Sequence, residues 1–201
     1  MYDWRKMTIE ERDEVLKDRT QKGYPWHSPP HQIGETDYYF ISGACYEHQT
    51  IIGTSPARMA QFSEWLLETL TKFCDDIYSW CVLPNHYHNL VKTKSLPVLV
   101  QELGKVHGRS SFQWNGEENY RGRKVWYNSV DRYIRNDRHF WTTMNYVHNN
   151  PVHHGYVKKW QEWSFSSAID FLEKVGREKA KEILLNCPLL DYGKGWDDSE
   201  L

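Results

Sequence analysis

Several features that define whole classes of protein are scarce or absent in this 201-residue sequence. No apolar run approaches the roughly 18 residues of a membrane helix, and the charged start from Met1 to Lys6 is unlike a secretory signal. We therefore expect a cytoplasmic protein without membrane contact. The four cysteines show no C-x-x-C spacing, so neither a disulfide framework nor a zinc knuckle is indicated. A net charge of −2 and 39% hydrophobic residues exclude a strongly basic tail, a disordered acidic chain and a low-complexity polymer.

Positive charge and aromatic side chains are concentrated in one part of the chain. Residues 101–160 carry a net charge of +5, whereas residues 1–100 carry −3 and residues 161–201 carry −4. Cations interleaved with flat aromatic rings suit a surface that follows a nucleic-acid backbone and stacks bases. Composition alone equally allows ordinary solvated helix faces beside an aromatic core.

The chain divides into three predicted parts. Residues 1–36 are expected to form an N-terminal arm, because the stretch 24–31 contains three prolines and can continue neither a helix nor a central strand. Residues 37–165 are expected to form the main domain, and residues 166–201 a C-terminal helix with an acidic tail. For residues 191–201 two interpretations stay open, a disordered tail or a strip that covers the cationic part of the protein.

Hydrophobic periodicity predicts the element order β-α-β-β-α-β followed by a further helix. The strands are expected at residues 38–45, 77–83, 86–92 and 124–133, with helices after Ser55-Pro56, from Leu96 to about Phe112, and after Asn136. Asn136 is expected to cap the last helix and Pro151 to end it. This order is typical of an α+β, ferredoxin-like antiparallel sheet, which many RNA- and DNA-binding proteins share and which does not by itself show a function.

A pair of histidines lies at the start of the third predicted strand. Because side chains alternate along a strand, His86 and His88 share one face and Tyr87 lies on the other. Two neutral imidazoles on adjacent same-face positions can bind one divalent ion. So short a motif also occurs by chance, and histidines that only form hydrogen bonds are the alternative interpretation.

A tyrosine and an asparagine lie four residues apart in the last predicted helix of the domain. Tyr146 and Asn150 therefore share a helix face, and Asn149 points elsewhere. This spacing can hold a phenol beside an amide oxygen that serves as a third metal ligand, with coordination positions left for phosphate oxygens. The alternative is a core tyrosine and an asparagine that caps the helix.

Together and in this order, the two motifs resemble those of the HUH single-tyrosine nuclease superfamily, and more closely those of the REP-associated tyrosine transposases related to small insertion-sequence transposases. The resemblance runs through about residues 29–165. Its most distinctive blocks are Tyr146 to Val157 and Trp163 to Ser167. The resemblance implies that His86 and His88 are metal ligands, that Tyr146 is the nucleophile and that Asn150 is the third ligand. One position departs from the family, because Tyr87 stands where a bulky aliphatic residue is usual; we interpret it as packing, with a rival nucleophile as the alternative.

The resemblance implies a metal-dependent endonuclease and strand transferase that acts on single-stranded DNA at REP-like hairpins, in DNA transposition. The implied cofactor is Mg2+ or Mn2+, and the implied intermediate is a 5′-phosphotyrosine. Six cations are expected to contact DNA phosphates: Arg121, Arg123, Lys124, Arg132, Arg135 and Arg138. A non-catalytic nucleic-acid-binding domain and a replication-initiator-type nicking nuclease are the alternatives, and monomer or homodimer stays open.

Overall fold

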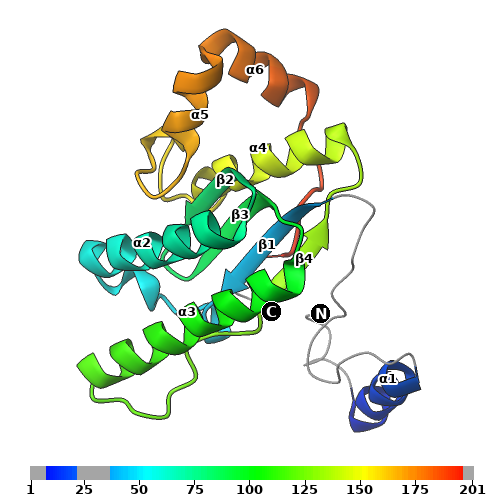
Figure 1. Cartoon of the computed structure of the whole chain (residues 1–201), viewed down its shortest axis with the longest axis vertical. Coiled ribbons are helices and arrows are strands. Elements are labelled where there is room, and N and C mark those ends of the chain that lie inside the picture. The colour runs from blue at the N-terminus through cyan, green and yellow to red at the C-terminus, as the bar shows by residue number, and fades with distance from the viewer. Residues whose placement is uncertain (1–7, 22–36, 197–201) are drawn as a thin grey trace.

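The computed structural model describes residues 8–21 and 37–196 (Figure 1). Within the predicted arm it contains helix α1 (Ile9–Gln21), which the sequence patterns did not predict. The proline-containing stretch 24–31, on which the prediction of an arm depends, lies outside the described residues. The domain boundaries expected after residues 36 and 165 stay predictions.

Four strands form one antiparallel sheet. The strands are β1 (Tyr38–Ala44), β2 (Asp76–Val82), β3 (His86–Lys92) and β4 (Val130–Tyr133), and their order across the sheet is β2-β3-β1-β4. β3 pairs with both β1 and β2, so it lies in the interior of the sheet. This order, with two crossover helices, confirms the predicted α+β, ferredoxin-like fold.

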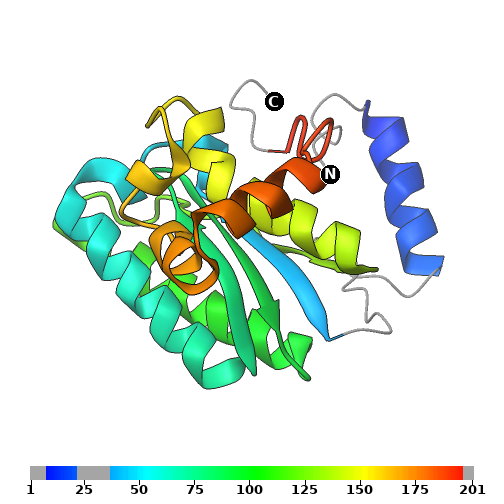
Figure 2. The ribbon, with the colours of Figure 1, turned by 90° about the horizontal axis from the view of Figure 1, so that it is seen from above.

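Helices cover both faces of the sheet. α2 (Pro56–Phe73) and α3 (Leu96–Glu117) lie against one face, and α4 (Asp137–His153) lies against the other (Figure 2). α5 (Ala168–Val175) and α6 (Arg177–Asn186) follow on the side of α4. Within residues 8–21 and 37–196, no helix has both the length and the apolar character that crossing a bilayer requires.

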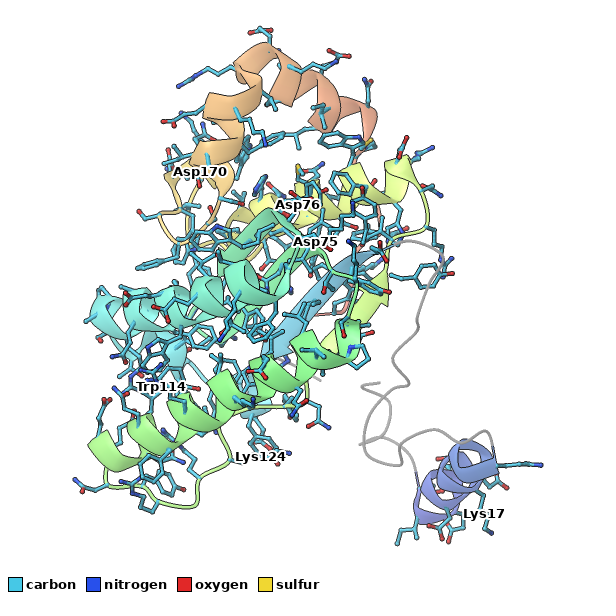
Figure 3. The ribbon with its side chains drawn as sticks, in the orientation of Figure 1. Lys17, Asp75, Asp76, Trp114, Lys124 and Asp170 are labelled. Carbon is cyan, nitrogen blue, oxygen red and sulfur yellow. The ribbon has the colours of Figure 1, made fainter. Side chains whose placement is uncertain are left out.

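Each face of the sheet has its own hydrophobic core. On one face Phe62 of α2 packs with Tyr87 and with Trp114, which lies on α3 (Figure 3). Gly43 lies opposite Tyr87 across the strands, and a Cβ atom there would come within 2.5 Å of the Tyr87 ring. The glycine is therefore required by the tyrosine. On the other face Phe40 and other strand residues pack against α4.

Two predicted boundaries near the cationic segment are wrong. Only Val130–Tyr133 is a strand, and residues 124–129 have no more than the isolated bridge between Cys45 and Trp126. The reason is that the neighbouring chain leaves the sheet after Ala44 and forms the 3-10 turn Tyr46–His48, so no partner strand continues. α3 also runs past Phe112 to Glu117, because buried side chains such as Trp114 continue its packing against α2.

Two further 3-10 turns lie at Ile52–Thr54 and Trp160–Glu162.

Two helix ends also differ from prediction. Asn136 caps α4 as predicted, its side-chain oxygen accepting from the His139 N–H at 2.9 Å. Pro151 does not end α4, because a proline in the last turn removes only one hydrogen bond and the N–H of His154 still donates to the Asn150 carbonyl at 3.0 Å. The single predicted C-terminal helix is two helices, which meet at Gly176 with φ of +79°.

Candidate active site

The paired histidines lie on the face of β3 that meets α4. His86 and His88 are almost fully buried, at 0% and 1% exposure, and their ring centroids are 4.9 Å apart. Leu90, the next residue on that face, packs in the same core as Val147 of α4. The predicted alternation along the strand therefore holds in the structure.

Helix α4 places the tyrosine and the asparagine opposite these histidines. The ring of Tyr146 is 5.2 Å from that of His88, measured between centroids. The side-chain oxygen Oδ1 of Asn150 is 2.9 Å from Nε2 of His86. The predicted shared face of Tyr146 and Asn150 thus meets the histidine face, and the structure brings all four residues together.

His148, which lies on α4 between Tyr146 and Asn150, connects this helix to the sheet. Nε2 of His148 lies 2.9 Å from Oγ of Ser167, and the same Oγ accepts the backbone N–H of Trp80 on β2 at 2.9 Å. Burial lowers the pKa of His148 to about 3, so its ring is neutral at ordinary pH. This neutral link fixes the register of α4 against β2, and with it the positions of Tyr146 and Asn150.

The donor atoms at this site fit a divalent ion. Two imidazole nitrogens and an amide oxygen are neutral donors suited to such an ion, and the rings of His86 and His88 and the amide of Asn150 lie together in a buried place. The amide nitrogen Nδ2 of Asn150 is buried there without a hydrogen-bond partner in the structure, which a stable protein interior rarely tolerates. In the described part of the chain, no three histidine, cysteine or carboxylate side chains group around a potential metal position. The Asn150 oxygen, expected from the sequence as the third donor, lies beside His86.

Tyr87 lies on the opposite face of the sheet. Its ring is fully buried, and its hydroxyl lies 3.0 Å from Nε2 of His107. Burial raises the pKa of this phenol well above its ordinary value. The sheet separates Tyr87 from Asn150 and Tyr146, in accordance with the interpretation that it is a packing residue.

The C-terminal segment covers Tyr146, which is only 4% exposed. The ring of Trp196 lies 5.5 Å from that of Tyr146, and the ring of Tyr192 lies 5.7 Å from it. Gly193, with φ of +82°, packs so closely that a Cβ atom would overlap the Tyr146 ring. The interpretation of residues 191–201 as a disordered tail is wrong for residues 191–196, because their aromatic rings add apolar contacts to α4; residues 197–201 lie outside the described part.

Three of the predicted DNA contacts lie near the end of α3. Arg121 is exposed and donates to the Phe112 carbonyl at 2.7 Å. Arg123 donates to Glu118 at 2.6 Å and to the side-chain oxygen of Asn115 at 2.9 Å, so its charge is already neutralised within the protein. Lys124 is exposed on the connection between α3 and β4 (Figure 3).

The other three lie on β4 and at the start of α4. The guanidinium of Arg132 lies 3.4 Å above the ring of Trp196, so this cation contacts the cover of Tyr146. Arg135 and Arg138 are exposed next to the N-terminus of α4. Arg121 and Arg123 thus contact residues of α3, whereas Arg132 contacts the C-terminal segment.

Sequence reasoning missed three features of the site. Asn85, which immediately precedes the paired histidines, has its Oδ1 atom 2.7 Å from Nδ1 of His86. The ring of His154 lies 4.9 Å from the His86 ring. Tyr192 and Trp196, which pack against Tyr146, are the third feature. Two aromatic residues four positions apart in an otherwise polar stretch were the signal in the sequence that this segment packs.

An antiparallel α+β sheet whose inner strand presents two histidines to a tyrosine-bearing helix is the arrangement that the resemblance to HUH single-tyrosine nucleases implies. No family model matches the chain. The chain is 27% identical over 97 residues to a Haemophilus influenzae protein described as "Putative REP-associated tyrosine transposase", covering 43% of this chain and 55% of that protein. The chain thus spans about half the length of this curated relative.

A solved structure shares the fold. This is the structure of a REP-associated tyrosine transposase bound to a REP hairpin, with a TM-score of 0.56 and 20% identity over 75% of this chain and 87% of that one. Together the two comparisons confirm the resemblance to the REP-associated tyrosine transposases.

Proposed function

We propose that this protein is a metal-dependent endonuclease and strand transferase that acts on single-stranded DNA at REP-like hairpins, in DNA transposition. One observation carries the proposal: two histidines of one strand and the Tyr146/Asn150 face of one helix meet at a buried site. The resemblance to REP-associated tyrosine transposases supports the same function, and the hairpin bound to the solved relative supports the class of substrate.

His86, His88 and Asn150 would hold a divalent ion, Mg2+ or Mn2+. When bound, such an ion supplies a positive charge that polarises the scissile phosphate and stabilises charge on its oxygens. The three protein donors are neutral, so they leave the charge of the ion undiminished. Their burial keeps competing water away from the donor atoms.

Tyr146 is the proposed nucleophile. Its phenolic oxygen forms a bond to phosphorus, and the bond from phosphorus to the 3′ oxygen breaks. The products are a 5′-phosphotyrosine and a free 3′-OH, the proton lost by the phenol being balanced by the one that the 3′ oxygen gains. Because the new bond is again a phosphodiester, attack by another 3′-OH reverses the step and joins strands without ATP.

The cover over Tyr146 limits access for DNA. With 4% of Tyr146 exposed, a phosphate reaches the phenol only after Tyr192, Gly193 and Trp196 have moved. Lys124, Arg135 and Arg138 are exposed cations that are proposed to contact phosphates. Arg132 becomes a further candidate when Trp196 leaves its guanidinium.

The proposal is tested by incubating the protein with a single-stranded oligonucleotide that carries a hairpin, in Mn2+, and separating the products on a denaturing gel. The wild type should form a covalent protein-DNA species, and Tyr146→Phe should keep the fold and DNA binding while losing that species completely. Tyr87→Phe is the matched control and should retain it. An undiminished adduct with Tyr146→Phe would place the nucleophile elsewhere, with Tyr87 as the first suspect.

The same assay separates the alternatives. A non-catalytic nucleic-acid-binding domain would bind the hairpin without any adduct. A replication-initiator-type nicking nuclease would share the same residues and form the same adduct, but it would act with a partner helicase domain. The adduct therefore separates the non-catalytic binding domain from the two nucleases.

A further inference from the structure

The side chain of Asn85 connects a turn of the chain to the first histidine. Its amide nitrogen donates to the backbone carbonyl of His48 at 3.0 Å, and its Oδ1 atom lies 2.7 Å from Nδ1 of His86. A backbone carbonyl can only accept, so the amide of Asn85 cannot turn over without losing this bond. Its oxygen must therefore face His86.

This orientation determines where His86 carries its proton. An amide oxygen at 2.7 Å requires an N–H on Nδ1 of the ring. In the neutral imidazole the other nitrogen, Nε2, then carries no proton and presents a lone pair. That lone pair faces the side-chain amide of Asn150 at 2.9 Å; the nitrogen of this amide has no other partner in the structure, so the amide can turn and donate to Nε2 when no metal is bound.

The backbone that holds Asn85 is itself in an uncommon conformation. Glu47 and His48 have φ of +54° and +50°, a region that residues other than glycine seldom adopt. This turn presents the His48 carbonyl to the Asn85 amide, while the backbone carbonyl of Asn85 accepts the N–H of Cys45 at 2.7 Å. Strained residues of this kind persist where the surrounding contacts determine them, often at functional sites.

We infer that Asn85 is a positioning residue that holds His86 in the tautomer whose Nε2 lone pair points at Asn150. The inference deepens the proposed function and rests on it for the link to a metal. A ligand histidine that donates its other N–H to an oxygen is oriented and made more basic by that partner. Loss of such a partner typically lowers metal affinity about 10- to 100-fold.

The tautomer is measured directly in the metal-free protein. Long-range 1H–15N correlation spectra of 15N-histidine-labelled protein report which ring nitrogen carries the proton, with His86 assigned from the loss of its signals in His86→Gln. In the wild type the proton should reside on Nδ1. Asn85→Asp loses the bond to the His48 carbonyl, but either carboxylate oxygen accepts from His86, so the proton should reside on Nδ1 there too. In Asn85→Ala this preference should be lost.

Metal affinity is measured by calorimetric titration with Mn2+ alone. Asn85→Ala should bind about 10- to 100-fold more weakly than the wild type, and Asn85→Asp should restore most of the affinity. Asn89→Ala is the control. Asn89 is a fully buried amide on the same strand, β3, but its side chain lies on the face of the sheet opposite to His86.

Each outcome decides the inference. A proton on Nε2 of His86 in the wild type, or an unchanged tautomer in Asn85→Ala, would overturn it. A changed tautomer with unchanged Mn2+ affinity would overturn its link to the metal. A wild type that does not bind Mn2+ would instead contradict the metal in the proposed function, while the spectra would still decide the role of Asn85.

Discussion

The two faces of β3 carry the same kinds of side chain and use them differently. On the face toward α2 and α3, the Tyr87 hydroxyl pairs with His107, whose ring stacks on Trp126 with centroids 4.2 Å apart. On the face toward α4, Nε2 of His86 and Oδ1 of Asn150 approach to 2.9 Å, and the Asn150 amide nitrogen has no hydrogen-bond partner in the structure.

Burial therefore does not distinguish a site from a core here, because Tyr87 and His86 are both fully buried. What differs is the pairing of polar atoms. A phenol and an imidazole complete each other as donor and acceptor, so the α2/α3 face stabilises the fold. On the α4 face the Asn150 amide nitrogen lacks a partner and its amide oxygen faces an imidazole nitrogen, so this face keeps polar atoms that can bind a ligand.

The largest expected effect follows from removing one residue on each face. His86→Ala should lower Mn2+ affinity by more than about 100-fold, because it deletes a proposed ligand and not only the partner of one. Tyr87→Phe should leave Mn2+ affinity within about twofold and instead lower the free energy of unfolding by about 1 to 3 kcal/mol, since His107 loses its partner. Calorimetric titration and urea denaturation of both variants measure the two quantities. Equal Mn2+ affinity of wild type and His86→Ala would rule out the ligand assignment.

The α2/α3 face should also make stability depend on pH. Burial lowers the pKa of His107 to about 3, whereas an unfolded histidine titrates near 6.5. Between these values only the unfolded state gains the proton, so stability is full above about pH 6.5 and falls by up to about 1.4 kcal/mol per pH unit as the pH drops toward 3.

His107→Gln should reduce this slope by about that amount, in urea denaturation between about pH 4 and about pH 7. His148, which is also buried with a lowered pKa, continues to contribute in the variant. His153→Gln, at an exposed histidine, is the control and should leave the slope unchanged. Identical slopes for wild type and His107→Gln would mean that His107 is protonated in the folded protein.

The cover of the α4 face should restrain the reaction. Trp196 contacts Phe40, Tyr146, Tyr192 and the guanidinium of Arg132. If Trp196→Ala weakens the cover by about 1.4 kcal/mol, the open population and the rate of adduct formation should rise about tenfold. Leu190→Ala, at a side chain that is 82% exposed, is the control. A slower rate with Trp196→Ala would indicate that this segment holds DNA and does not exclude it.

The smallest expected effect concerns a single phosphate contact. Lys124→Ala should lower the magnitude of the negative slope of log K against log salt by roughly 0.7 to 0.9, and should weaken binding about equally for matched and scrambled hairpins. Arg123→Ala should lower the free energy of unfolding and leave this slope nearly unchanged, because Arg123 is paired with Glu118 within the protein. Binding measurements at several salt concentrations separate the two variants. A loss limited to the matched hairpin would show instead that Lys124 contacts a base edge.

Local spacing was sufficient for much of the fold and for the composition of the site. The strand His86–Lys92 and the capped start of α4 lie where their residues predicted them. The errors arose where distant contacts outweigh local preference: α3 is prolonged by packing of Trp114, and residues 124–129 lack a partner strand because the chain turns away after Ala44.

The sequence by itself determined which residues share a face, because the two-residue period of a strand and the 3.6-residue period of a helix are set by backbone geometry. That reasoning places His86 with His88, and Tyr146 with Asn150. Only the tertiary structure decided that these two faces meet, that Asn85 orients His86, and that residues 192–196 lie over Tyr146. Each of these depends on residues far apart in the chain, since even the neighbours Asn85 and His86 are oriented by the distant His48 carbonyl. Their geometry follows from how whole elements pack, which no local period encodes.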